Sequence, residues 1–170
     1  MRKLHIIILI IAISFILDQL TKFIIMGQFF EVVPLYSLEL LPEVFLYKVS
    51  SFFNLVLVYN TGSSFSLGAE IGIKMPWIFL IIYVLIMSYL IRLLFIGDRR
   101  FEIVSLSLVL GGALGNFIDR IRFNSVVDFL HFHGWGYHWP VFNLADSFIV
   151  IGVFLYIICG ITASKKKVIK

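Results

Sequence analysis

The chain has 170 residues, a length that fits one domain. Hydrophobic residues make up 61% of it and charged residues 14%, whereas soluble chains contain roughly 45–50% and roughly 25%. A water-soluble fold of this size cannot bury so much apolar surface, so the composition indicates an integral membrane protein. The net charge of +4 does not indicate nucleic-acid binding, because the basic residues do not interleave with aromatic residues on a polar stretch. The single cysteine, Cys159, excludes an intramolecular disulfide.

Four segments have the length and composition of transmembrane helices, which need roughly 20 mostly apolar residues. They run over Leu4 to about Ile25, Trp77–Ile96, Ile103 to about Ile118 and Ala145 to about Ala163. The first follows two basic residues, as a signal peptide does, but no small-x-small cleavage site follows it. We therefore expect one domain, residues 1–170, that crosses the membrane four times.

Basic residues divide unevenly between the two sides that four spans define. The side with both termini and the loop between the second and third spans carries nine of the 14 Lys and Arg residues, which leaves five for the other side. The nine are Arg2, Lys3, Arg92, Arg99, Arg100, Lys165, Lys166, Lys167 and Lys170. Because basic loops stay in the cytoplasm, both termini are predicted to be cytoplasmic and the segments at about 26–75 and 119–144 to lie outside.

The two outer segments carry signals for a small sheet at the membrane surface. Phe52–Tyr59 is rich in aromatic and β-branched residues and ends at the turn signal Asn60-Thr61-Gly62, which predicts a strand. Phe29–Leu35 is a candidate partner strand. The shorter outer segment contains aromatic residues that suit the membrane interface, namely Trp135, Tyr137 and Trp139. The predicted fold class is therefore all-α membrane protein, with four transmembrane helices and a small extracytoplasmic β-sheet.

Carboxylates stand at the outer ends of the predicted spans. An ionisable group in the hydrocarbon costs at least roughly 2.5–3.5 kcal/mol, so such groups usually serve a site. The aspartates are Asp18, Asp119, Asp128 and Asp146, and the polar residues near them are Asn60, Asn116, Arg120 and Asn143. Separate segments thus bring polar groups to one depth, which indicates a functional site at the outer face.

Structural roles also explain some of these residues. Asp18 and Lys22 are four residues apart on a helix and can form an ion pair. Asp119-Arg120 can be a helix end that reaches the headgroups, and Asp146 can cap the fourth span. Asp128 lies in the apolar stretch VVDFL, where a carboxylate has no evident structural purpose.

Two carboxylates held close together share one proton, because both cannot readily ionise. Such a pair deprotonates a water molecule and protonates the leaving group, which is the chemistry of aspartic peptidases. It needs no nucleophilic side chain, metal or cofactor.

Five motifs in chain order resemble those of the lipoprotein signal peptidases (signal peptidase II) of bacteria, over nearly the whole chain. They are DQLTK (Asp18–Lys22), NTGSSFS (Asn60–Ser66), GGALGNFIDR (Gly111–Arg120), VVDFL (Val126–Leu130) and FNLADS (Phe142–Ser147). The sequence departs from the family pattern at Ser63 and Ser64, where alanines are usual. The region Ser37–Lys48 also looks longer than the usual connection, and its role is open.

The resemblance implies an aspartic endopeptidase of the bacterial inner membrane that removes the signal peptide from diacylglyceryl-modified prolipoproteins, cutting before the lipidated cysteine. It places the catalytic pair on Asp128 and Asp146. Substrate binding would fall to Asn60, Gly62, Asn116, Arg120 and Asn143, and structural support to Asp18, Lys22 and Asp119. The partners expected are the lipid-modified substrate and membrane lipid. We expect no nucleic acid, metal or cofactor, and a monomer.

Two other readings compete with this one. His131, His133 and His138 follow Asp128, and a His-x-His spacing can bind zinc in a metal-dependent enzyme. No fourth ligand is evident, and the histidines match none of the five motifs. A transporter would show broken helices at mid-membrane depth and an internal repeat, and the only glycine pair in a span is Gly111-Gly112.

Overall fold

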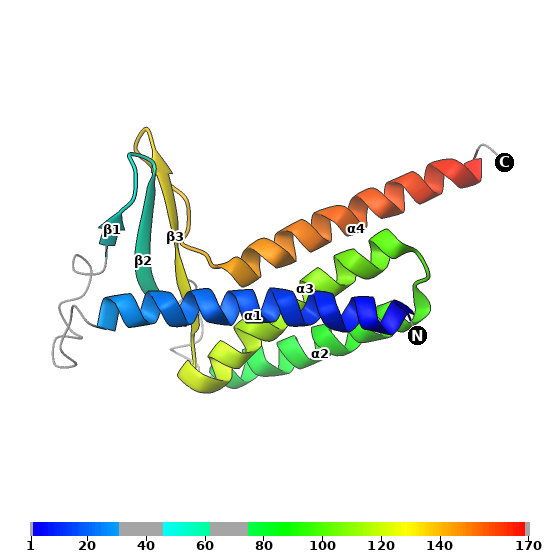
Figure 1. The fold of residues 1–170 in the computed structure, drawn as a ribbon, viewed down its shortest axis with the longest axis horizontal. Coiled ribbons are helices and arrows are strands. Elements are labelled where there is room, and N and C mark those ends of the chain that lie inside the picture. Colours follow the sequence, from blue (N-terminus) through cyan, green and yellow to red (C-terminus); the bar gives the residue numbers. More distant parts are fainter. Residues whose placement is uncertain (1, 31–45, 62–74, 169–170) are drawn as a thin grey trace.

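The computed structural model describes residues 2–30, 46–61 and 75–168 (Figure 1). In chain order the elements are α1 (Arg2–Phe30), β1 (Leu46–Lys48), β2 (Phe53–Asn60), α2 (Met75–Ile96), α3 (Arg100–Phe123), β3 (Val126–Gly134), β4 (Tyr137–His138) and α4 (Leu144–Val168).

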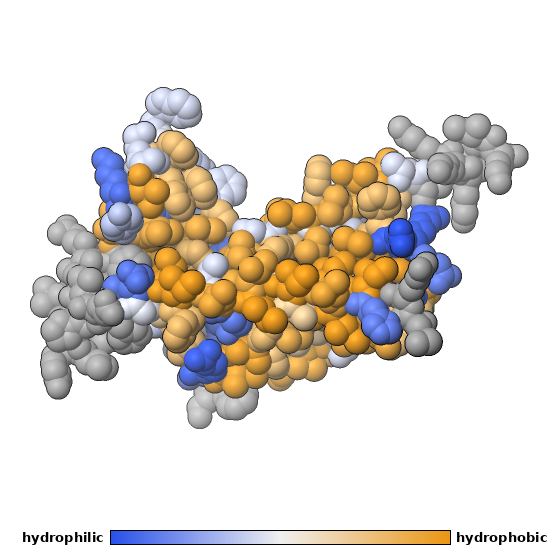
Figure 2. All heavy atoms as spheres, viewed as in Figure 1, coloured by the Kyte–Doolittle hydropathy of each residue, from blue (hydrophilic) through white to orange (hydrophobic). Residues whose placement is uncertain are grey.

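All four helices are long and apolar enough to cross a membrane, which confirms the four predicted spans. Each helix runs unbroken between its bounds and extends beyond the apolar stretch that predicted it. Large apolar side chains point outward from the bundle, as the exposures of Phe23 (70%) and Leu85 (64%) illustrate. Hydrophobic residues cover the middle of the face seen in Figure 2, and hydrophilic ones gather towards its two ends. This surface requires lipid as its solvent, so the chain is a multi-pass membrane protein.

The helix α3 occupies the centre of the bundle and packs against α1, α2 and α4. Its apolar side meets α2 in a core cluster of buried residues, namely Met87, Leu90, Leu94, Ile103, Leu106, Val109, Leu110 and Ala113. The side of α3 that carries glycines lets α1 and α4 approach closely. A Cβ on Gly112 would lie 2.5 Å from the backbone oxygen of Ala145 in α4, and one on Gly115 would collide with the carboxylate of Asp18 in α1. The GGALG sequence is therefore a contact surface that draws α1 and α4 onto α3.

The four strands described form one antiparallel sheet in the order β1-β2-β3-β4. The predicted strand at Phe52–Tyr59 is confirmed as β2. The partner predicted at Phe29–Leu35 is wrong for Phe29 and Phe30, because the α1 helix, with no proline to interrupt it, continues through them; residues 31–35 lie outside the described part of the chain. The strand paired with the outer edge of β2 is instead β1.

The hairpin of β3 and β4 was not predicted from the sequence. Its two-residue turn is Trp135-Gly136, with positive φ angles of 50° and 78°, as a type I′ turn requires. Side chains alternate along β3, so Asp128 and Phe132 share one face and His131 lies on the other. Phe132 stacks on Phe53 at 4.7 Å between ring centroids on the apolar face.

The sheet and the termini lie at opposite ends of the bundle (Figure 1). The start of α1, the end of α4 and the short connection from α2 to α3 lie toward one end of the long axis, with α4 splayed away from the others, while β2 and β3 cross the other end. This arrangement agrees with four antiparallel crossings. It brings the ends of α1 and α3, the start of α4 and the strand β3 to one place, where the polar residues converge.

Candidate active site

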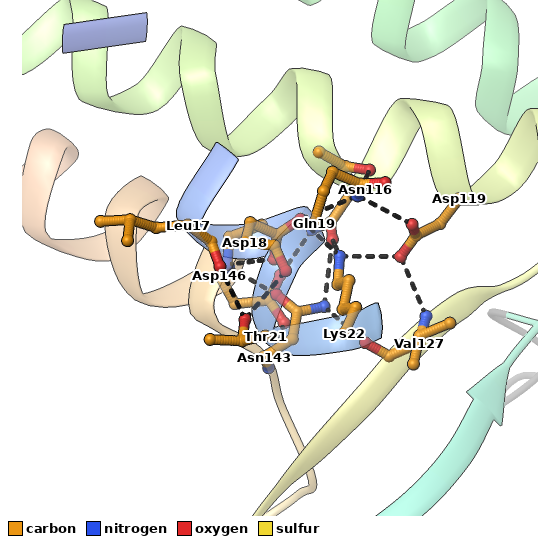
Figure 3. A network of polar contacts seen from close by, with 12 residues as sticks. Leu17, Asp18, Gln19, Thr21, Lys22, Asn116, Asp119, Val127, Asn143 and Asp146 are labelled. Atoms are coloured by element: carbon orange, nitrogen blue, oxygen red, sulfur yellow. Dashed lines mark hydrogen bonds and ion pairs between the residues drawn. The ribbon is translucent and has the colours of Figure 1, made fainter. Parts of the chain in front are cut away.

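A buried lysine is the centre of a polar cluster between α1 and α3 (Figure 3). Lys22 is 1% exposed, and its Nζ lies 2.9 Å from Asp18 Oδ2 and 2.7 Å from Asp119 Oδ2. It also donates a 3.0 Å hydrogen bond to Asn116 Oδ1. The predicted Asp18–Lys22 ion pair is therefore present, and Asp119 joins it. Because Asp119 and Arg120 are both buried, the interpretation of this dipeptide as a helix end reaching the headgroups is wrong.

The two anions of this cluster each hold a backbone amide of a neighbouring element. Asp18 Oδ1 accepts a 2.9 Å hydrogen bond from the amide of Ala145, in the first turn of α4. Asp119 Oδ2 accepts one of 3.2 Å from the amide of Val127 in β3. Ala145 precedes Asp146 and Val127 precedes Asp128. The ion cluster thus fixes the backbone immediately before each of the two remaining aspartates.

Two asparagines connect these aspartates to each other. Asn143 Nδ2 donates a 2.8 Å hydrogen bond to Asp128 Oδ1 and one of 3.0 Å to Asn116 Oδ1. Asn116 Nδ2 donates in turn to Asp146 Oδ1 at 2.8 Å. The path Asp128–Asn143–Asn116–Asp146 is continuous, so residues from β3, α3 and the start of α4 form one site.

A reciprocal cap at the start of α4 sets the position of Asp146. The amide of Asp146 donates to Asn143 Oδ1 at 2.9 Å, and the amide of Asn143 donates to Asp146 Oδ2 at 3.2 Å. This is the geometry of a capping box, and it satisfies amides that a helix start leaves without partners. The predicted capping role of Asp146 is present, and its Oδ1 still reaches Asn116.

Asp128, the aspartate at the other end of this path, is 2% exposed, and its carboxylate accepts side-chain amide hydrogen bonds at both oxygens. Asn60, the last residue of β2, donates to Oδ2 at 2.9 Å. The pKa of Asp128 is raised to about 6: desolvation by burial is the largest cause and the nearby charge of Asp146 adds to it, while the hydrogen bonds from Asn60 and Asn143 oppose the rise. A carboxyl with this pKa gains and loses a proton near neutral pH, as acid–base chemistry requires.

Two site residues predicted from the sequence have other outcomes, and one residue of the site was not predicted. Arg120 is 7% exposed and turns toward α2, where its guanidinium carbon lies 4.4 Å from the ring centroid of Phe79 and 5.8 Å from that of Tyr83. Gly62 lies outside the described residues. Gln19 was missed by the sequence analysis, although its Nε2 donates to Asp18 Oδ2 and Asp119 Oδ1, both at 3.1 Å. Its place in the DQLTK motif was the available signal.

The histidines do not contribute to this site. His131 and His133 are three and five positions after Asp128 on β3, so the alternation of side chains along a strand places them on the opposite face. The described residues contain no group of three or more His, Cys, Asp or Glu side chains disposed to hold a metal ion.

Comparison with known proteins identifies the family. A family model described as signal peptidase (SPase) II matches residues 10–162. The chain belongs to the signal peptidase II family. A lipoprotein signal peptidase of Azoarcus sp. is 40% identical over 154 residues, which cover 89% of this chain and 80% of that protein. One of Aeromonas hydrophila is 39% identical over 161 residues, which cover 92% and 88%.

Solved structures agree with this assignment. A bacterial membrane enzyme solved by the in meso method at 2.3 Å superposes with a TM-score of 0.73 at 34% sequence identity, over 95% of this chain and 90% of that one. The protein is therefore a membrane-embedded lipoprotein signal peptidase by family, an aspartic peptidase that cleaves signal peptides, and the resemblance noted in the sequence is confirmed.

Proposed function

We propose that this peptidase cuts diacylglyceryl-modified prolipoproteins directly before the lipidated cysteine, and that Asp128 and Asp146 activate the water that cuts. The observation that carries the proposal is the hydrogen-bonded path from Asp128 through Asn143 and Asn116 to Asp146. Amides cannot ionise, so this path orients two carboxylates without neutralising either of them.

The mechanism follows from one proton shared between the pair. The ionised aspartate takes a proton from a water molecule, whose oxygen attacks the carbonyl carbon of the residue before the cysteine. The protonated aspartate gives its proton to the cysteine nitrogen as the peptide bond breaks. The released signal peptide ends in a carboxylate, and the mature lipoprotein begins with a free amine.

Both carboxylates keep acceptor capacity for this chemistry. Asp128 accepts one amide bond at Oδ1 from Asn143 and one at Oδ2 from Asn60. Asp146 accepts one at each oxygen as well, from Asn116 and from the backbone of Asn143. Each carboxylate oxygen has two lone pairs, so each retains one for water or substrate. Asp146 is also more exposed than Asp128, which gives the site its opening.

Substrate contacts fall to the polar residues around the pair, which are Asn60, Gly62, Asn116, Arg120 and Asn143. Arg120 is the strongest candidate, because its buried Nε and Nη1 have no hydrogen-bond partner among the described residues. A substrate carbonyl placed there would satisfy donors that are otherwise costly to bury. Asp18, Lys22 and Asp119 support the site through the backbone amides that they hold. In Figure 2 the molecular surface is hollowed between the sheet and α4. The hollow lies beside the start of α4, the helix whose first turn carries Asp146. We propose that the substrate enters there from the bilayer.

The same proposal assigns the protein to the bacterial inner membrane as a monomer in contact with lipid, with both termini cytoplasmic and the aspartates at the outer face. Support comes from the nine basic residues on the side of the termini against five on the other. In a Cys159→Ala background, an impermeant thiol reagent should label intact cells through cysteine at exposed Tyr137 and not at exposed Asp98. The reverse pattern would contradict this orientation.

The test of substrate class compares two precursors that differ only in lipid. The purified enzyme in detergent should release the signal peptide from a diacylglyceryl-modified precursor much faster than from the unmodified one. EDTA or phenanthroline should leave the rate unchanged, because paired aspartates need no metal. Equal rates on both precursors would remove lipoprotein maturation as the function, and inhibition reversed by zinc would remove the two-aspartate mechanism.

A further inference from the structure

Three histidines lie close together on one face of the sheet, and the proposed hydrolysis does not use them. His131 and His133 are two positions apart on β3, and His138 of β4 pairs in register with His133. Their ring centroids are 5.2 to 5.6 Å apart, and the planes of any two rings differ by 13° to 30°. The three imidazoles therefore form one group that joins β3 to β4.

A hydrogen bond between two of these rings requires at least one of them to be neutral. Nε2 of His131 and Nδ1 of His138 are 3.1 Å apart. One of these nitrogens must carry a proton and the other a lone pair. An imidazolium ring has a proton on both nitrogens and no lone pair, so protonation of both rings places N–H against N–H. The bond therefore forms at neutral pH and is lost in acid once both rings are protonated.

The charge next to these histidines within the sheet is positive. Cross-strand neighbours share a face, and His131 is opposite Asn54 of β2, which is opposite Lys48 of β1. Tyr137, next to His138 on β4, lies on the other face. Among the described residues no carboxylate forms an ion pair with any of the three rings. The charged side chains that α1 and α3 bring to this end of the bundle make their contacts elsewhere, and they are Asp18, Lys22, Asp119, Arg120 and Arg122. Protons added to the rings therefore repel one another and Lys48, with no anion beside them.

The environment of His131 opposes its protonation in the closed hairpin. Its pKa is lowered, with desolvation by burial as the largest cause, followed by the neighbouring His138 and His133. A histidine without such contacts titrates at about 6.5. As the pH falls below that value, the open hairpin binds more protons than the closed one, so acid favours the open form. Above that value the closed form keeps its full stability.

Few backbone bonds oppose the opening of this hairpin. The strands β3 and β4 form only two register pairs. The amide of Trp139, directly after β4, donates a 2.9 Å hydrogen bond to the backbone oxygen of Phe132 in β3. Phe142 then forms a bridge to β3, and the next residue, Asn143, donates to Asp128. Release of β4 therefore loosens the segment that leads to a residue of the proposed active site.

We propose that His131, His133 and His138 form a pH-sensitive switch that holds β4 on β3 at neutral pH and releases it in acid. The switch responds below about pH 6.5, where histidine side chains become charged. Release loosens the link to Asn143 and slows the peptidase in acid. This effect on catalysis rests on the proposed function, whereas the opening of the hairpin does not.

The test is hydrogen exchange of backbone amides in the full-length protein in detergent, at about pH 7.5 and about pH 5, on either side of the ordinary histidine pKa. Each rate is divided by the rate of an unprotected amide at the same pH, so that only protection is compared. The protection of the Trp139 amide should fall about tenfold at the lower pH, as a shift of one pKa unit between the closed and open forms produces. Amides in the middle of α3, such as that of Leu110, should keep their protection.

Single variants identify the groups responsible. His131→Phe and His138→Phe keep an aromatic ring but remove its nitrogens, so the protection of Trp139 should be lower at the higher pH and should change much less between the two. Asp128 also titrates in this range, because its pKa is about 6, and Asp128→Asn should keep the wild-type fall. The matched control, His5→Phe, should keep it too, because His5 lies toward the opposite end of α1 from the sheet.

Equal protection of the Trp139 amide at the two pH values in the wild type would overturn the proposal. That measurement needs no variant, so a variant that fails to fold leaves the test intact. A full wild-type fall in His131→Phe or His138→Phe would also overturn it. Loss of the fall in Asp128→Asn would do the same, because it would assign the change to the aspartates. None of these readouts depends on peptidase activity, so their failure is distinct from failure of the proposed function.

Discussion

Lys22→Met removes the cation that lies between the buried carboxylates of Asp18 and Asp119. Asp18 is 0% exposed and Asp119 1%, and Lys22 Nζ lies within 3 Å of an oxygen of each. Methionine fills much of the lysine volume, so the change removes charge more than packing. Removing one partner of a buried ion pair costs about 3–5 kcal/mol, because the remaining charge is left uncompensated. We expect a loss of that size in the free energy of unfolding.

The structure provides a matched control in Lys3→Met. Lys3 Nζ lies 3.8 Å from the carboxylate of Asp98, but that carboxylate is 95% exposed, and exposed pairs contribute about 0–1 kcal/mol. Thermal unfolding in one detergent should therefore separate the two variants clearly. Adding Asp119→Asn to Lys22→Met should recover part of the loss, because one uncompensated charge fewer is buried. A Lys22→Met protein that melts with the wild type would refute this reasoning.

Two further changes test the packing and the electrostatics of the site. Gly112→Ala should destabilise the protein by about 1–3 kcal/mol, because the new Cβ meets the backbone oxygen of Ala145. Gly160→Ala is the control and should leave the stability unchanged, because a Cβ at Gly160 has no neighbouring atom within 4 Å. Equal melting temperatures for the two variants would contradict the close contact of α3 and α4. Asn60→Ala removes a hydrogen bond that stabilises ionised Asp128, so the pKa of Asp128 should rise above about 6. In a plot of kcat/KM against pH, the limb that reports the ionisation of Asp128 should then move to higher pH. A shift to lower pH would contradict the role of Asn60.

The helices could be predicted because each depends on a local property, a run of about 20 apolar residues. The strand β2 was equally local, with its aromatic and β-branched run ending in a turn signal. The hairpin was missed because Trp135 is an unusual residue at positive φ, so the sequence lacks the Asn-Gly or Asp-Gly signal of a type I′ turn. The pairing of Phe29 failed because a short apolar run fits a helix end as well as a strand.

The residues of the site could be predicted from the sequence, but the hydrogen bonds that connect them could not. The motifs brought out Asp128, Asp146 and the asparagines, but spacing could not show that Asn143 and Asn116 connect the two carboxylates. It could not show either that Asp18 binds the amide of Ala145, since 127 positions separate the two residues. Such contacts depend on how the helices pack, and the glycines of α3 set that packing without carrying any polar group.

The most direct measurement is the specific activity of Asp128→Asn and Asp146→Asn on a lipid-modified precursor. Asparagine keeps the shape of aspartate but cannot transfer the proton, and general acid–base assistance is worth about 10²–10⁴-fold. Each variant should lose at least that factor, and the double variant should be little worse, because the pair acts as a unit. Asp98→Asn, at an exposed carboxylate, should retain wild-type activity. Substantial cleavage by either site variant, with a wild-type melting temperature, would contradict catalysis by this pair.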